Sequence, residues 1–197
     1  MNRSKLSKDQ GQAVEHVKSM IVTLIEKSVP VELISGGLLE VWLSYEGVIG
    51  KIPKDNIKMC LPKLVTTPGN IIIQLTKLLE KFPNPIYSPS DMQRFSQIDQ
   101  LRKLFLQEEN TTEYANHKDL AHKIKEKILT CCMLLQAEQI KANDIAFALF
   151  YLWVRMCTLR DDKLQDFYAK LDYYCISVLK KVRRSLIEKL FIANLID

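Results

Sequence analysis

Five cations gather near the C-terminal end of this chain: Lys180, Lys181, Arg183, Arg184 and Lys189. Val178, Val182 and Leu186 recur every four residues, which predicts a helix that turns these apolar side chains inward and the cations outward. An outward basic stripe can neutralise nucleic-acid phosphates or contact an acidic protein partner. It can also be a solvated face whose cations complement the negative end of the helix dipole. The residues alone leave all three interpretations open.

A second pattern resembles part of a phosphate-binding loop. Gly47, Gly50 and Lys51 match the spacing of that loop in part. A complete loop needs a glycine at position 45 and a hydroxyl after the lysine, because backbone amides cradle the phosphate and the hydroxyl reaches Mg²⁺. Tyr45 and Ile52 stand at these two positions. We therefore expect a surface loop here and no bound nucleotide or other cofactor.

The residue types that ligate metals or attack substrates are not spaced for either task. His117 and His122 are five residues apart, so they do not share one face of a helix. Cys131 and Cys132 are adjacent and point in different directions, and no C-x-x-C, H-E-x-x-H or G-x-S-x-G motif occurs. The sequence predicts no metal site and no catalytic residue, and hence a protein that is not an enzyme.

Composition describes an ordinary folded protein. The chain has 197 residues, of which 47% are hydrophobic and 26% charged, and its net charge is +5. The odd number of cysteines, five, predicts free thiols in a reducing compartment. No apolar run follows the polar N-terminus, and Pro68-Gly69 interrupts Leu64–Thr76, the longest uncharged stretch. We expect no membrane span and an intracellular location, in the cytoplasm or the nucleus.

The distribution of glycine and proline predicts the fold class. All six glycines and all seven prolines precede Ser90. Because these residues favour turns and interrupt helices, the remainder predicts long helices. We expect an all-α bundle of about eight helices without a sheet. Residues 1–87 form a half of short, punctuated helices, and residues 88–197 form a bundle of long helices packed with it as one domain.

Particular elements follow from capping and periodicity. Ser7 and Gln10 resemble a capping box that opens a helix ending near Ser28. The next helix carries an apolar stripe up to Tyr45, and Gly36-Gly37 should weaken or bend it. Residues 145–157 are apolar on every face, which predicts a central helix with Phe150 and Trp153 in the core.

The last helix is expected to begin at Asp161-Asp162 and to run to Asn194. At 1.5 Å per residue its roughly 34 residues would span about 50 Å, more than a compact domain of this size covers. Its end would then leave four apolar side chains without cover: Phe191, Ile192, Leu195 and Ile196. We expect these residues to dock on a partner chain, either a second copy or a different protein.

One short segment resembles the junction into the third helix of a histone fold. Ile140, Asp144, Ile145, Ala148 and Leu149 match that junction, in which the first residue lies in a short loop and the Asp caps the next helix. The arginine that usually precedes the loop is absent. The resemblance covers this segment alone.

These patterns together predict a non-enzymatic helical interaction module, a subunit or adaptor of a protein complex. The alternative is a nucleic-acid-binding protein that uses the basic face of the last helix. Steep salt dependence of binding would distinguish the alternative, because each phosphate contact releases counterions.

Overall fold

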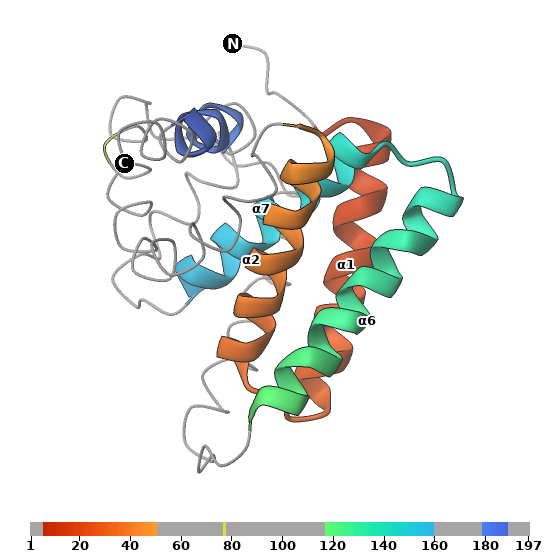
Figure 1. Ribbon diagram of the computed structural model, residues 1–197, viewed down its shortest axis with the longest axis vertical. Helices are drawn as coiled ribbons and strands as arrows, with labels where there is room; N and C mark the ends of the chain where they lie inside the picture. The colour runs from red at the N-terminus through yellow and green to blue at the C-terminus, as the bar shows by residue number, and fades with distance from the viewer. Residues whose placement is uncertain (1–5, 51–76, 78–116, 160–178, 189–197) are drawn as a thin grey trace, which may run out of the picture.

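The computed structural model describes residues 6–50, 77, 117–159 and 179–188 (Figure 1). Nearly all of these residues are helical and none of them forms a strand, so the all-α prediction is confirmed for this part of the chain. The segments are α1 (Lys8–Glu26), α2 (Val31–Val48), α6 (His117–Ala137), α7 (Ala142–Leu159) and the helical residues 179–188.

The finer predictions of helix number and length are not supported. The described residues include five helices of more than one residue, and the expected total of about eight is not supported. Of the expected long C-terminal helix, the structure describes only residues 179–188, and residues 160–178 and 189–197 lie outside the described part. The predicted boundary near residue 88 lies outside it too.

The start of α1 follows its sequence signal closely. The backbone amide of Gln10 donates to Ser7 Oγ at 3.1 Å, and the Ser7 amide donates to Gln10 Oε1 at 3.3 Å. These two bonds satisfy amides that the first turn of a helix leaves unpaired, so the predicted capping box is confirmed. Helix α1 ends at Glu26, close to the predicted end, and Ser28 then adopts a φ of 56° before Pro30.

The adjacent glycines Gly36 and Gly37 do not interrupt α2. The helix is continuous from Val31 to Val48. A methyl group added at Gly37 would lie 2.9 Å from Ile128 Cδ1 and 3.3 Å from Ile124 Cγ2, whereas nothing lies within 4 Å of one added at Gly36. Gly37 therefore packs directly against Ile124 and Ile128 of α6, at a position that was predicted to weaken or bend α2.

Helix α7 occupies the centre of the core, as its all-round apolar character predicted. It packs against α1 and α2, and its side chains join one buried cluster with those of α1, α2, α6 and residues 179–188. The ring of Trp42 from α2 lies 4.9 Å from Phe150 and 5.9 Å from Trp153. Phe150 and Trp153 are both buried, which confirms their predicted place in the core.

The starts of α1 and α7 and the ends of α2 and α6 lie at the same end of the molecule as residues 179–188 (Figure 1). The start of α1 reaches the end of α6 through a hydrogen bond of 2.7 Å from Gln12 to Glu138. It reaches the start of α7 through Gln10, which donates to Asp144 Oδ1 at 2.9 Å. Among the helices described, none is long and apolar enough to cross a bilayer.

The resemblance to a histone-fold junction places Asp144 at a helix cap, and the structure differs. Helix α7 begins at Ala142, so Asp144 lies within its first turn. Its carboxylate accepts a hydrogen bond from Gln10 of α1. Asp144 therefore joins two helices that are distant in sequence.

Candidate functional site

A pocket of about 580 Å³ opens at this end of the bundle. Its walls come from the first turns of α1 and α7 and from residues 179–188: Gln10, Asn143, Phe147, Lys180, Arg183, Arg184, Ile187 and Glu188. Three of these side chains are cationic, one is anionic, and Phe147 and Ile187 are apolar. The pocket thus combines basic groups with an apolar wall.

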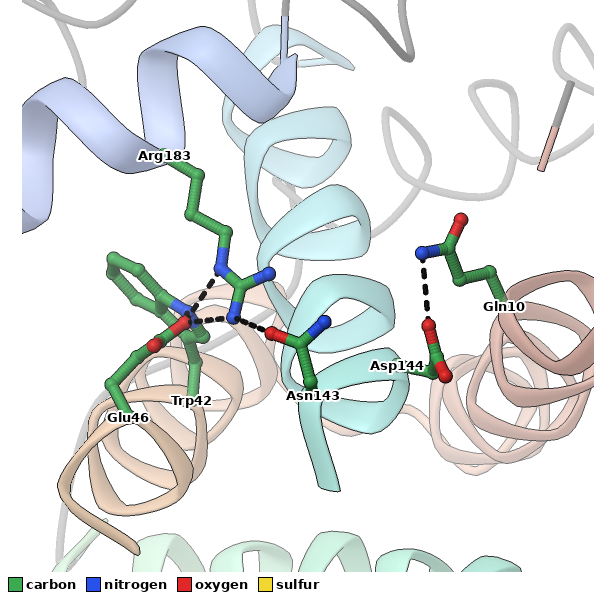
Figure 2. Close-up of polar contacts among 6 residues, drawn as sticks. All are labelled: Gln10, Trp42, Glu46, Asn143, Asp144 and Arg183. Carbon is green, nitrogen blue, oxygen red and sulfur yellow. Dashed lines mark hydrogen bonds and ion pairs between the residues drawn. The ribbon is translucent and has the colours of Figure 1, made fainter. Parts of the chain in front are cut away.

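Arg183 is held in place by a buried carboxylate (Figure 2). Glu46 of α2 is 0% exposed and Arg183 is 6% exposed. Arg183 Nε and Nη2 lie 2.6 Å and 2.5 Å from the same oxygen, Glu46 Oε1. The indole Nε1 of Trp42 also donates to this oxygen, at 2.8 Å. Three donors therefore converge on one carboxylate oxygen, and they tie residues 179–188 to α2.

This ion pair corrects the prediction that all five cations face outward. Among those in the described part, Lys180, Lys181 and Arg184 are exposed, whereas Arg183 turns inward. A buried charge needs a partner with close hydrogen-bond geometry, and Glu46 supplies it. The apolar positions Val182 and Leu186 are buried as predicted.

One end of the Arg183 guanidinium has no partner among the residues that the structure describes. Nη2 donates to Asn143 Oδ1 at 3.4 Å in addition to its contact with Glu46. Nη1 forms no hydrogen bond or ion pair with any residue in the described part of the chain. Figure 2 shows this nitrogen directed away from Glu46. Two N–H donors on a nearly buried side chain thus remain available at the pocket wall.

The other cations of the pocket differ in their surroundings. Lys180 Nζ lies 5.8 Å from the centre of the Phe147 ring and pairs with no carboxylate of a described residue. Arg184 Nε donates to Glu188 Oε1 at 2.9 Å on the exposed surface. Lys181 is exposed and does not line the pocket. The predicted contacts Lys189, Phe191, Ile192, Leu195 and Ile196 lie outside the described residues.

Several residues of this site were not foreseen from the sequence: Gln10 as a wall of the pocket, Glu46, and Asn143. A signal for Glu46 was present, because helical spacing puts it on the same side of α2 as Leu39, Trp42 and Leu43. All three of these neighbours are buried. A carboxylate on such a face predicts a buried cationic partner, although it does not say which one.

The thiols of α6 are free and poorly suited to nucleophilic chemistry. Burial raises the pKa of Cys132 to about 12, and the hydrogen bond from the Tyr45 hydroxyl offsets only part of that rise. Burial also raises the pKa of Cys131 and of Tyr45. Because the thiolate is the reactive form, neither cysteine is an activated nucleophile at neutral pH. Within the described ranges, no three metal-ligating side chains come together.

Comparisons with protein-family models, curated proteins and solved structures found no match to this chain. Function is therefore inferred from the geometry of the pocket. That geometry offers fixed hydrogen-bond donors, a surface cation and an apolar wall, which together suit the binding of an anionic group with an apolar neighbour.

Proposed function

We propose that this protein is a non-enzymatic helical interaction module, a subunit or adaptor of an intracellular complex. The pocket at the end of the bundle is its contact surface. One observation carries this proposal: Lys180, which pairs with no carboxylate of the described residues, lies over the ring of Phe147 beside a pocket whose wall includes the fixed guanidinium of Arg183. Basic and aromatic groups on a rigid frame are frequent where proteins bind one another.

A protein partner fits this site better than the alternative, a nucleic acid. A phosphate-binding stripe requires several outward cations that are free to pair with phosphates. Glu46 compensates the charge of Arg183, and Glu188 compensates that of Arg184, so neither arginine adds excess positive charge for a phosphate. Lys180 and Lys181 remain as exposed cations without a carboxylate partner in segment 179–188. The apolar part of the pocket wall, where Ile187 is 8% and Phe147 is 1% exposed, offers a small contact area for a peptide side chain.

The four apolar residues beyond Glu188 (Phe191, Ile192, Leu195 and Ile196) are proposed as a second contact with the same partner. They follow the pocket residues directly in sequence, so a partner seated on segment 179–188 lies within their reach. Ile187 belongs to the buried cluster, and a deletion that removes it would disturb the core. A truncation that tests the tail should therefore begin at Lys189.

Size-exclusion chromatography with light scattering, on the full chain isolated from its native source, tests the proposal. The wild-type protein is expected to elute in a complex with a protein partner or a second copy. The double variant Lys180→Glu/Arg184→Glu should reduce the complexed fraction. The matched control Lys123→Glu/Lys127→Glu reverses as many charges on the exposed face of α6, which contributes nothing to the pocket, and should have no effect.

Two results would contradict the proposal. The first is a chain that elutes as a monomer at every concentration, with no partner protein in its fractions. The second is a complex whose retained component is nucleic acid and whose stability falls steeply with salt. The second result would support the alternative function instead.

A further inference from the structure

The free end of Arg183 is the most specific feature of the pocket. A guanidinium has five N–H donors in one plane. Arg183 commits the Nε donor and the Nη2 donors to Glu46 and Asn143, which leaves both donors of Nη1 without an acceptor among the described residues. Nη1 is not among the fully buried atoms without a partner, so water reaches it at the pocket wall, and an acceptor atom of a ligand can take the place of that water.

The ligand atom must be a hydrogen-bond acceptor, because Nη1 is a donor. Glu46 fixes the orientation of the Arg183 guanidinium and therefore the direction from which the acceptor binds. Because three donors hold Glu46 Oε1, the guanidinium plane is set before any ligand arrives. A group held in its binding geometry loses little conformational entropy when the ligand binds. The start of α7 lies beside Arg183 at Asn143, and its helix dipole adds positive potential there.

The charge balance of the pocket disfavours a doubly charged anion. Glu46 compensates Arg183 and Glu188 compensates Arg184, which leaves Lys180. Asp144, whose carboxylate accepts a hydrogen bond from Gln10 of the pocket wall, offsets the charge of Lys180, so these six side chains carry no net charge. A phosphate group carries about −1.5 to −2 at neutral pH and would be repelled more strongly by these acids than a carboxylate.

We infer that the pocket binds a carboxylate from an acidic segment of a partner protein. The carboxylate lies between Nη1 of Arg183 and Nζ of Lys180, and a neighbouring apolar side chain of the segment packs at the part of the wall where Ile187 reaches the surface. This inference rests on the proposed function and names the chemistry of the partner. Arg183 supplies directional hydrogen bonds, Lys180 supplies the compensating charge, and the apolar wall distinguishes a peptide from a small free acid.

Fluorescence anisotropy with the full chain tests this recognition. The probe is a labelled peptide of alternating glutamate and leucine, and the matched control peptide has glutamine in place of glutamate. The control should bind at least about tenfold more weakly, because it removes the charge-assisted hydrogen bonds. Inorganic phosphate and a short single-stranded DNA serve as competitors, and neither should displace the acidic peptide as well as the unlabelled peptide does.

Substitutions of Lys180 and Arg183 test whether these two cations bind the acidic peptide. Lys180→Glu should weaken the acidic peptide by about tenfold or more, because an attraction becomes a repulsion. Arg183→Lys keeps a positive charge near Glu46 and removes Nη1, so it should also weaken binding; its melting curve shows whether the fold is retained. Lys123→Glu, on α6, should leave the affinity unchanged. Equal binding of the glutamate and glutamine peptides, or an unchanged affinity in Lys180→Glu, would overturn the inference.

The two proposals can fail separately. A native complex that forms equally well with Lys180→Glu would overturn carboxylate recognition and leave the interaction module standing. Specific binding of the acidic peptide by a protein that forms no complex would support the pocket chemistry and contradict the proposed function.

Discussion

Helices α2 and α7 meet in two regions of opposite character. In the middle they pack through aromatic rings, with Trp42 against Phe150 and Trp153. At the end where the pocket lies, Glu46 of α2 and Asn143 of α7 both contact Arg183. Trp42 belongs to both regions, since its ring joins the aromatic cluster and its Nε1 donates to Glu46. We call the contact of Trp42 with Phe150 and Trp153 the aromatic seam, and the contact of Glu46 and Asn143 with Arg183 the polar seam.

The two regions contribute differently to the folded state. Burying a large apolar side chain stabilises a protein by about 1.5–3 kcal/mol, with little demand on direction. A buried ion pair contributes little net stability, because the loss of hydration offsets most of the attraction. The aromatic seam therefore holds the helices together. The polar seam fixes how one side chain, Arg183, is presented to the pocket.

The largest loss of stability is expected from a substitution in the aromatic seam. Trp153 is 2% exposed, and Trp153→Ala should lower the free energy of unfolding by about 3–5 kcal/mol, because it removes a large side chain and leaves a cavity. Urea unfolding followed by circular dichroism measures the change. Met133→Ala is the control, since Met133 is 66% exposed and its loss should change stability by no more than about 0.5 kcal/mol. An unchanged midpoint in Trp153→Ala would remove that side chain from the core.

The next largest loss of stability is expected when only one partner of the ion pair in the polar seam, Arg183, is replaced. Arg183→Met leaves the carboxylate of Glu46 buried without its cation and should lower the free energy of unfolding by about 3 kcal/mol. Glu46→Gln/Arg183→Met should recover most of this loss, because glutamine is neutral and keeps an oxygen for the indole of Trp42. A double variant less stable than Arg183→Met would show that the pair itself stabilises the fold.

Alkaline pH tests a third group, the thiol at the seam between α2 and α6. Burial raises the pKa of Cys132 from 9.0 to about 12, so above pH 9 the unfolded chain loses this proton while the folded chain keeps it. The stabilising contribution is complete below pH 9 and falls by about 1.4 kcal/mol per pH unit between pH 9 and 12. Urea unfolding at pH 8, 9 and 10 gives the slope. Cys132→Ala should flatten this slope, and an equal slope in both proteins would contradict the assignment.

Adjacent glycines offer a smaller and sharper comparison. Gly36→Ala should stabilise α2 by roughly 0.5–1 kcal/mol, because the added methyl group meets nothing and alanine favours helix. Gly37→Ala gains the same helix propensity but crowds Ile128 and Ile124, so it should be less stable than Gly36→Ala by about 1 kcal/mol or more. Thermal unfolding shows which of the two variants is more stable. Equal stability would mean that α6 shifts to accommodate the methyl group at Gly37 without a cost in stability.

The burial of Phe150 and Trp153 could be predicted from the sequence, whereas their contact with Trp42 and the polar seam could not. The all-round apolar residues 145–157 and the capping box at Ser7 are local patterns, and each determines its element through neighbours a few residues away. The contact of Arg183 with Glu46 joins residues 137 positions apart. No local pattern says which of several adjacent cations turns inward, since that choice depends on where α2 ends relative to residues 179–188.

The smallest expected effect compares the two adjacent arginines directly. Arg184 pairs with Glu188 one turn away, and both side chains are largely exposed, so water screens their attraction. Arg184→Met should therefore change the free energy of unfolding by no more than about 0.5 kcal/mol, far less than Arg183→Met. The same urea titrations measure both variants, and raised salt should not alter the Arg184→Met result further. A loss in Arg184→Met as large as that in Arg183→Met would mean that the two arginines are equally structural. In that case burial against Glu46 would no longer explain why Arg183 is held in place while its neighbour stays in water.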